Sequence, residues 1–292
     1  MNLIVDSGTT KTDWLIVREG TVVDSVCTKG MNPYFQSQED IRKELRDVLL
    51  PGMKAVFAGG VSVGTVYFYG AGCVFDKVEM MREALSSRIP ARAIHVYSDL
   101  LAAAHSTCGH EAGIACILGT GSNSCFYDGE KIVKNISPLG YVLGDEGGGA
   151  MLGRTLVSDV LKEILPRPLR EAFFERFRMT QADILEHVYK KPFPNRFLAG
   201  FSPFLHEHGN DPEIRRILVN GFNSFFTRNV MQYDYKTHTV NFVGSVAYHY
   251  EEILRVTAES AGMRVGKIIR SPLEGLVDYY SGHFASLRNG KD

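Results

Sequence analysis

The 292-residue chain lacks the features of several large protein classes. It has no block of lysine and arginine and carries a net charge of -1, so nonspecific binding to nucleic acid has no electrostatic support. No apolar run approaches the roughly 20 residues that cross a bilayer. No basic stretch precedes the first apolar run, which argues against a signal peptide. We therefore expect a cytoplasmic protein without a nucleic-acid or membrane partner.

The chain also lacks the residue spacings of metal and hydrolase sites. No HExxH or similar pattern supports zinc, and no GxSxG segment supports a hydrolase triad. No two cysteines form a CxxC pair, and their number is odd, which predicts reduced, mostly buried thiols. The cysteines are Cys27, Cys73, Cys108, Cys116 and Cys125.

Two parts of the chain repeat one order of predicted elements. The first hundred residues read as three strands and then alternating helices and strands. From residue 113 the same order, βββαβαβα, begins again, and the second hairpin of this part turns at Asp128-Gly129. The first hairpin of each part turns through a Gly/Thr/Ser-rich segment, "DSGTTKT" or "GTGSNS". The pattern predicts internal duplication, with coincidence as the alternative.

Local signals predict helix starts and the domain organisation. Ser37 with Asp40 suggests a capping box before residues 41–50, and Asp211-Pro212 suggests an N-cap with a proline at N1. We expect a first lobe of residues 1–110 and a second of 111–281, with a helical insertion at about 165–237. The C-terminal helix, about 282–292, is expected to pack back on the first lobe.

The segment "DSGTTKT" has two readings. It lacks the GxxxxGK[ST] spacing of a Walker A loop, and no GxGxxG opens a helix after a strand. Taken alone, it is favoured as a polar hairpin turn. Its pairing with "GTGSNS" changes this interpretation, because two such turns facing each other across a cleft would offer N–H groups and hydroxyls to a polyphosphate.

Three acidic residues are candidates for catalysis or binding. Asp99 follows a predicted strand, where it could cap the next helix or act as a general base, and the residues alone favour neither. Asp145 and Glu146 could complement a helix N-terminus, or bind sugar hydroxyls or hydrated Mg²⁺. The three glycines that follow each cost up to about 1 kcal/mol in a helix, which suggests a close approach to the backbone.

These motifs together resemble the actin/hexokinase/Hsp70 ATPase superfamily, within it the BadF-type ATPases, and most closely the N-acetylglucosamine kinases. "DSGTTKT" and "LGTGSNS" are similar to the two phosphate motifs, and "VGSVA" at 243–247 to the adenosine motif. "SDLLAA" resembles the stretch with the catalytic aspartate, and "GMNPYF" and "GDEG" resemble sugar-binding segments. The tryptophan expected before "GDEG" is absent, and so is the Cys-rich loop of the ROK-type kinases.

The resemblance implies an α/β fold: a duplicated ribonuclease H-like (actin-like ATPase) fold with two lobes, a central cleft and a helical insertion in the second lobe. It implies an ATP-dependent kinase that transfers the γ-phosphate to the 6-hydroxyl of N-acetylglucosamine or a related amino sugar, with ATP and Mg²⁺ as cofactors. A homodimer is also expected.

The resemblance further assigns roles to residues. Asp99 would be the catalytic base, and Asp6 would order hydrated Mg²⁺. The sugar would be bound by Asp99 together with Asn32, Asn123, Asp145 and Glu146. The nucleotide would be held by Ser7, Gly8, Thr9, Thr10, Lys11, Gly119, Thr120, Gly121, Ser122, Gly244 and Ser245.

Two other functions are open. One is a 2-hydroxyacyl-CoA dehydratase activator, an ATP-driven electron donor of the same branch, which needs well-placed cysteines for an Fe–S cluster. Cys73 and Cys108 are the candidates for that role. The other is a non-catalytic sensor of sugar or nucleotide with the same fold.

Overall fold

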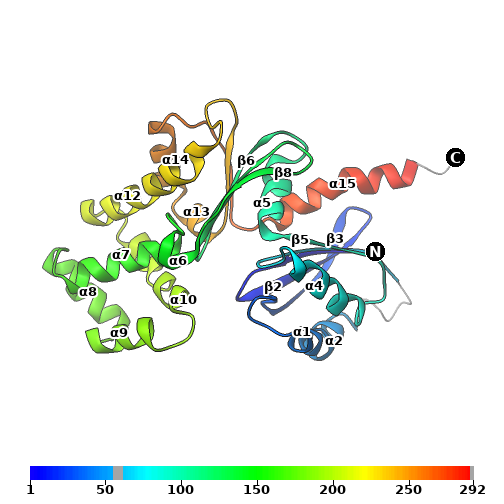
Figure 1. Ribbon diagram of the computed structural model, residues 1–292, viewed down its shortest axis with the longest axis horizontal. Helices are drawn as coiled ribbons and strands as arrows, with labels where there is room; N and C mark the ends of the chain where they lie inside the picture. Colours follow the sequence, from blue (N-terminus) through cyan, green and yellow to red (C-terminus); the bar gives the residue numbers. More distant parts are fainter. Residues whose placement is uncertain (55–61, 290–292) are drawn as a thin grey trace. The chain divides into compact units, whose positions relative to one another are not determined.

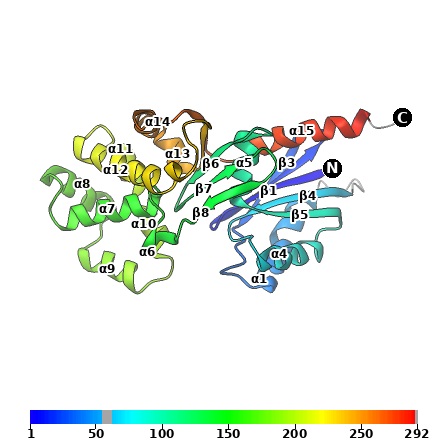
Figure 2. The same ribbon diagram turned by 45° about the horizontal axis from the view of Figure 1, so that its top comes forward.

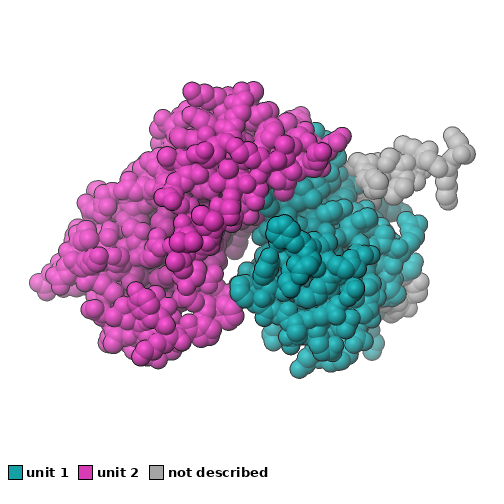
Figure 3. Space-filling view, viewed as in Figure 1, with its two compact units in different colours: residues 1–110, 272–292 teal, residues 111–271 magenta. Residues whose placement is uncertain are grey.

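The computed structural model describes residues 1–54 and 62–289, and the chain divides into two compact units. Unit 1 comprises Met1–His110 and Pro272–Asp292, and unit 2 comprises Glu111–Ser271 (Figure 3). Each unit contains one five-stranded sheet. None of the helices in the described ranges combines the length and the apolar composition needed to cross a bilayer.

Unit 1 contains a sheet with the strand order β3-β2-β1-β4-β5 (Figure 1). The first three strands are antiparallel neighbours, whereas β4 runs parallel to both β1 and β5. The strands are β1 (Asn2–Ser7), β2 (Lys11–Arg18), β3 (Thr21–Lys29), β4 (Val63–Gly70) and β5 (Ala91–Ser98). The helices are α1 (Gln38–Glu44), η1 (Leu45–Leu49), α2 (Leu50–Gly52), α4 (Asp76–Ser86), α5 (Asp99–Cys108) and α15 (Leu273–Asn289).

Alternating side chains of β1 pack on the two faces of this sheet. Leu3 and Val5 belong to the core shared with α1 and α4, whereas Ile4 packs with residues of α5 and α15. This is the period of two expected of a strand that is buried on both faces. Figure 2 shows α1 and α4 on one side of the sheet and α5 and α15 on the other.

Unit 2 repeats this topology. Its sheet has the order β10-β9-β6-β7-β8. Read from the other end, β8, β7, β6, β9 and β10 take the places of β3, β2, β1, β4 and β5 in the first sheet. The predicted duplication is therefore confirmed. The strands are β6 (Gly113–Leu118), β7 (Ser122–Tyr127), β8 (Ile132–Ile136), β9 (Val240–Val243) and β10 (Val265–Ile269). The helices next to the sheet in sequence are α6 (Gly140–Leu143), α7 (Gly149–Leu161), α13 (Ser245–His249) and α14 (Glu251–Ser260).

A helical segment lies between α7 and β9, as the sequence predicts. Its phenylalanines Phe222 and Phe226 share one core with Phe242 of the sheet, so the segment is part of unit 2 rather than a separate domain. Asp211 caps the longest helix of this segment by accepting the Glu213 N–H, as expected. The elements are α8 (Arg167–Phe177), α9 (Gln181–Tyr189), α10 (Pro194–Ala199), α11 (Ser202–Glu207), α12 (Pro212–Arg228) and η2 (Val230–Gln232).

The C-terminal helix joins unit 1 at an earlier residue than the sequence suggested. We expected the return at about 282, whereas unit 1 resumes at Pro272. The physical reason is that Leu276 and Tyr280, which are four residues apart on one face of the helix, are buried with Ile4 of β1. Of the expected segment 282–292, residues 290–292 lie outside the described residues.

Candidate functional site

Three parallel strands of unit 1 end at one edge of its sheet. The register aligns Ser7 of β1 with Gly70 of β4, and Gly70 with Ser98 of β5. Side chains at or just beyond these strand ends therefore meet at the carboxyl edge, where ligands bind in open α/β sheets. Three of the predicted site residues, Asp6, Ser7 and Asp99, are among them.

Asp99 is not the cap of its helix. Ser98 takes that role, because its Oγ accepts the Leu101 N–H at 3.2 Å. Asp99 is the first residue of α5, and its Oδ1 accepts the Leu100 N–H at 2.9 Å. Burial raises the pKa of the Asp99 carboxyl, although the side chain keeps some exposure. The structure thus leaves Asp99 available as a proton acceptor.

Asp6 lies in a cluster of like charges. Burial, then the charges of Asp99 and Asp13, raise the pKa of Asp6 to about 7, while Lys11 acts in the opposite direction. Asp13 lies across from Asp6 in the β1–β2 register. Lys11 Nζ is 2.5 Å from Asp13 Oδ2, and this contact raises the lysine pKa.

Asp13 was missed by sequence reasoning. The signal that could have found it is the hairpin: once the turn is centred on Thr9-Thr10, residue 13 must lie opposite residue 6.

The carboxylates of unit 1 fit a hydrated cation better than a fully protein-ligated one. Within residues 1–54 and 62–289, no three or more His, Cys, Asp or Glu side chains are grouped so that they could hold a metal. Mg²⁺ commonly uses only one or two carboxylates and keeps several waters or takes phosphate oxygens. Asp6, with Asp99 close enough to raise its pKa, meets that requirement.

Ser7 connects the first Gly-rich turn to the segment of Asn32. Its buried hydroxyl shares a 2.7 Å hydrogen bond with Thr12 Oγ1, donates to the Met31 carbonyl and accepts the Met31 N–H. At Gly30 the two segments touch, because a Cβ there would lie 2.4 Å from the Thr9 carbonyl carbon. The Ser7 side chain is therefore engaged within the protein, and it positions the neighbouring segment.

Asn32 is held with one face of its amide directed to the protein. Its Oδ1 accepts the Tyr34 N–H at 3.0 Å, which leaves Nδ2 as the donor for a ligand. Gly72, with a φ of 77°, lies against this amide, and a Cβ there would be 2.4 Å from Oδ1.

The tip of the first turn is exposed. Gly8 N–H donates to the Lys11 carbonyl at 2.9 Å, closing a tight turn. Thr10 and Lys11 are exposed at its tip. The structure thus presents these two predicted phosphate ligands at the surface of unit 1.

The second Gly-rich turn, in unit 2, rests on the start of α7. The carbonyls of Gly119 and Thr120 accept the N–H groups of Gly149 and Ala150, both at 2.8 Å. Gly119 N–H donates to the Gly121 carbonyl at 2.9 Å. The first N–H groups of α7 therefore hold the turn, and Thr120 remains exposed at the tip.

Two glycines of "GDEGGGAMLG", Gly148 and Gly153, are explained by close contacts with protein backbone. A Cβ on Gly148 would lie 2.6 Å from the Gly121 carbonyl carbon, and one on Gly153 would lie 1.9 Å from the Leu198 carbonyl oxygen of α10. The close approach that the composition suggested is present, and its partners are the second turn and α10.

The side chains of Asp145 and Glu146 contact different parts of unit 2. Asp145 has a left-handed backbone, with φ 55°, and its Oδ1 accepts the Ser122 N–H at 3.2 Å. That amide is therefore engaged by Asp145. Glu146 instead pairs with Arg228, with Oε1 and Nε 2.7 Å apart, and it lines a cavity next to α12. Of the two predicted sugar ligands, only Asp145 contacts the second turn.

The remaining predicted residues of unit 2 lie near the same turn. Gly244 has a φ of 124°, and a Cβ there would lie 2.3 Å from the Leu118 carbonyl oxygen, which brings the end of β9 against Gly119. Ser245 is exposed at the start of α13. Asn123 Oδ1 accepts the Ser124 N–H and an Asn135 Nδ2–H, both at 2.9 Å.

The cysteines do not support a shared cluster. All five are free thiols, three of them buried, as expected. Cys73 lies near Asp99, because burial and then the Asp99 charge raise its pKa to about 12. Cys108 ends α5, one helix length or roughly 14 Å from the Asp99 end. A separation of that size argues against an Fe–S cluster held by Cys73 and Cys108.

Comparison with solved structures gives a near neighbour over the full chain. The "Putative N-acetylglucosamine Kinase" from Porphyromonas gingivalis is 47% identical, with a TM-score of 0.93, 97% of this chain covered and 99% of that one. The "Putative N-acetylglucosamine Kinase" from Chromobacterium violaceum is 15% identical, with a TM-score of 0.75 and coverages of 95% and 98%.

A more distant structure shares the fold. The ROK family glucokinase from Streptomyces griseus, solved with glucose and AMPPNP, is 17% identical, with a TM-score of 0.60 and 99% of both chains covered. A scan against protein-family models gives no match, and a comparison with curated proteins gives none.

Proposed function

The chain belongs to the N-acetylglucosamine kinase-like family of BadF-type ATPases, in the actin/hexokinase/Hsp70 superfamily, and we propose that it is an ATP-dependent amino-sugar kinase. Family membership supports a carbohydrate kinase. The finer proposal is that the acceptor is N-acetylglucosamine or a related amino sugar and that its 6-hydroxyl is phosphorylated. ATP is proposed as donor in line with the AMPPNP complex of the Streptomyces griseus glucokinase.

The position of Asp99 carries this proposal. A half-buried carboxylate that is not the helix cap lies at the carboxyl edge of three parallel strands, beside a second carboxylate. Burial raises the pKa of Asp99, which makes it a stronger base for a substrate hydroxyl proton. In the proposed reaction Asp99 takes that proton while the sugar oxygen attacks the γ-phosphorus, and the bond from the γ-phosphorus to the β–γ bridging oxygen breaks as ADP leaves.

The other residues orient the reactants. In unit 1, Asn32 Nδ2 donates to a sugar hydroxyl, and the tip residues Thr10 and Lys11 contact phosphate oxygens. In unit 2, Thr120 offers a hydroxyl to phosphate, and Asp145 orients the sugar. Bound Mg²⁺, ordered by Asp6, supplies neutralisation of phosphate charge, which with positioning accounts for most catalysis of phosphoryl transfer.

A coupled ADP-release assay over a sugar panel tests the proposal. The panel contains N-acetylglucosamine, N-acetylmuramic acid, glucosamine and glucose, each with MgATP, and ³¹P NMR identifies the phosphorylated position. We expect ADP release that depends on an amino sugar and a 6-phosphate product. Asp99→Asn is the control, and sugar-dependent turnover near the wild-type rate in that variant would contradict the role of Asp99.

A non-catalytic sensor is the competing function. It would bind an amino sugar or ATP in a calorimetric titration and release no ADP with any sugar of the panel. A cytoplasmic location and a homodimer stay predictions that accompany the proposed kinase.

A further inference from the structure

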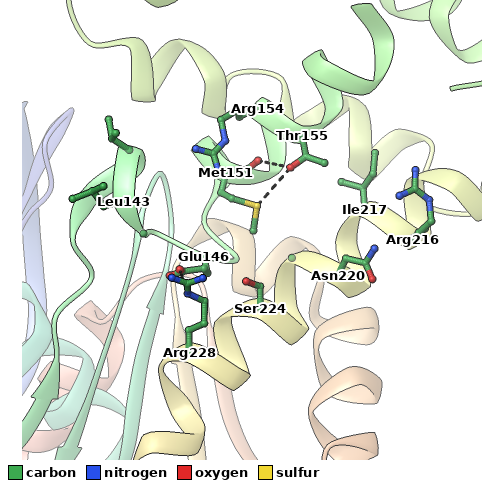
Figure 4. Close-up of a pocket in the computed structure, with 13 residues that line it drawn as sticks. Leu143, Glu146, Met151, Arg154, Thr155, Arg216, Ile217, Asn220, Ser224 and Arg228 are labelled. Carbon is green, nitrogen blue, oxygen red and sulfur yellow. Dashed lines mark hydrogen bonds and ion pairs between the residues drawn. The ribbon is translucent and has the colours of Figure 1, made fainter. Parts of the chain in front are cut away.

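A cavity of about 270 Å³ lies in unit 2 between α6, α7 and α12 (Figure 4). Its floor forms where the two long helices approach closely. Gly221 allows this approach, because a Cβ there would lie 2.5 Å from a methyl carbon of Leu152. The volume lies just below the usual range for ligand pockets, roughly 300–1,000 Å³, and suits a ligand of a few heavy atoms to about one sugar ring.

The lining is rich in arginine. Arg216 is committed to two carboxylates, with Nε 2.8 Å from Glu213 and a terminal nitrogen 3.3 Å from Asp159. Arg228 uses Nε for Glu146, so its terminal nitrogens remain as donors. Arg154 has only a long contact, 3.4 Å, to the Tyr141 carbonyl, and it pairs with no carboxylate in the described chain.

Further donors surround the same space. Figure 4 shows Arg154 on α7 above the cavity, with Ser224 and Asn220 on α12 below it and Glu146 beside Arg228. Ser224 and Asn220 make no side-chain hydrogen bond among the described residues, so their hydroxyl and amide can donate to a ligand. The α6 side adds apolar surface, since Val142 and Leu143 line the cavity and are largely exposed.

The cavity is on the opposite side of α7 from the second Gly-rich turn. Met151, Arg154 and Thr155 face the cavity, whereas Gly149 and Gly153 face the turn and α10. At 100° per residue these two sets lie on opposite faces of the helix. A ligand in the cavity is therefore not the phosphate chain that the turn would hold.

We propose that this cavity binds the phosphate group of a small phosphate monoester. Two guanidinium groups, a hydroxyl and an amide line it, and these are the groups from which a phosphate accepts hydrogen bonds, with arginine forks matching its oxygens. The apolar α6 wall then contacts the carbon part of the ester. This inference does not depend on the reaction that the chain catalyses.

A carboxylate beside the cavity would compete with phosphate for one of the two arginines. Glu146 holds Arg228, so an incoming phosphate must share this arginine with a carboxylate. Glu146 follows Asp145, whose pKa is raised by burial and, to a smaller extent, by the Glu146 charge. A phosphate bound in the cavity would therefore lie beside the residue that follows Asp145 in the chain.

Titration calorimetry with inorganic phosphate and with glycerol 3-phosphate, each in the presence of saturating AMPPNP, tests the proposal. We expect both probes to bind the wild type. Arg154→Gln should weaken both by about tenfold or more, since it removes a charged donor. Glu146→Gln should tighten them by about threefold or more, because Arg228 is released. Arg215→Gln, an exposed arginine on α12 outside the cavity, is the matched control and should leave both unchanged.

The opposite signs separate a binding role from a structural one, because loss of fold would weaken binding in both variants. Circular dichroism melting of each variant confirms that it is folded. Absence of phosphate binding by the wild type would overturn the proposal. So would an Arg154→Gln affinity within about twofold of the wild type, or a loss caused equally by Arg215→Gln.

Discussion

The carboxylates of Asp6 and Asp99 repel each other at the carboxyl edge of the unit 1 sheet. Burial first and the Asp99 charge second raise the pKa of Asp6 to about 7. One residue belongs to the first strand and the other begins α5, so only the parallel register of β1, β4 and β5 brings them together. Near neutral pH the pair favours a proton or a cation, and Mg²⁺ accompanying ATP would be such a cation.

Asp99→Asn should change both the chemistry and the titration of Asp6. We expect the variant to fold and to bind AMPPNP while sugar-dependent ADP release is lost. We also expect the pKa of Asp6 to fall from about 7 toward its ordinary value, because a repelling charge is removed. NMR titration of the side-chain carboxyl carbons measures this shift. Asp145→Asn, in unit 2, is the control and should leave the Asp6 titration unchanged.

Asp6→Asn should stabilise the fold at high pH. The folded-state pKa of about 7 is above the ordinary 3.8, so the folded state binds more protons between these values, and wild-type stability falls as pH rises through that window. The neutral isostere removes this loss. We expect the free energy of unfolding to exceed that of the wild type by about 2–4 kcal/mol at pH 8 and to match it near pH 4. Urea unfolding in Mg²⁺-free buffer measures this, and parallel profiles for the two proteins would contradict it.

His105 should lower the free energy of unfolding as the pH falls, which is opposite to the effect of Asp6. Burial, then the charge of His110, lower the pKa of His105 to about 4, and its Nδ1 lies 2.8 Å from the Tyr69 hydroxyl. Between pH 6.5 and 4 the unfolded state binds more protons, so this contribution is present above 6.5 and is lost as the pH falls. In the Asp6→Asn background we expect unfolding free energy to drop by about 2–3 kcal/mol across that window. Addition of His105→Gln should flatten the profile, and an unchanged slope would argue against His105 as the titrating group.

Gly148→Ala and Gly119→Ala should distinguish a glycine that packing requires from a glycine that a ligand approaches. The Gly148 methyl would meet the backbone of Gly121 at 2.6 Å, so we expect a loss of about 1–3 kcal/mol in unfolding free energy. The Gly119 methyl would meet nothing within 4 Å, so stability should stay within about 0.5 kcal/mol after allowance for the lost backbone freedom. If phosphate approaches Gly119, AMPPNP binding should weaken in this variant. Full AMPPNP affinity in Gly119→Ala would remove the residue from the nucleotide site.

The sequence predicted helix starts and turns well where the residues that determine them are close together along the chain. The capping box of Ser37 and Asp40 is present as expected, because both hydrogen bonds form within one helical turn. The two Gly-rich hairpin turns were found from their composition. The return of the C-terminal helix was placed ten residues too late, because the partners of Leu276 lie at the other end of the chain.

The sequence predicted the segments of the candidate site better than it predicted the contacts that their side chains make. Asp99 could be chosen from its place after a strand, yet only the Ser98 hydrogen bond shows that Asp99 is not the cap. Glu146 follows Asp145 in sequence but is directed to Arg228 by the left-handed backbone of Asp145 and the position of α12. Composition carries no record of this left-handed φ angle, which non-glycine residues adopt only rarely.

The sequence by itself determined the duplicated order of strands and helices, the two Gly-rich turns and the acidic residues beside them. These depend on hydrophobic period, turn chemistry and capping, which act over a few residues. The tertiary structure decided which of those residues meet: Asp6 with Asp99, Ser7 with Met31, and Asp145 with Ser122. It also decided the surroundings that raise the pKa of Asp6, because burial and repulsion arise only when distant segments pack together.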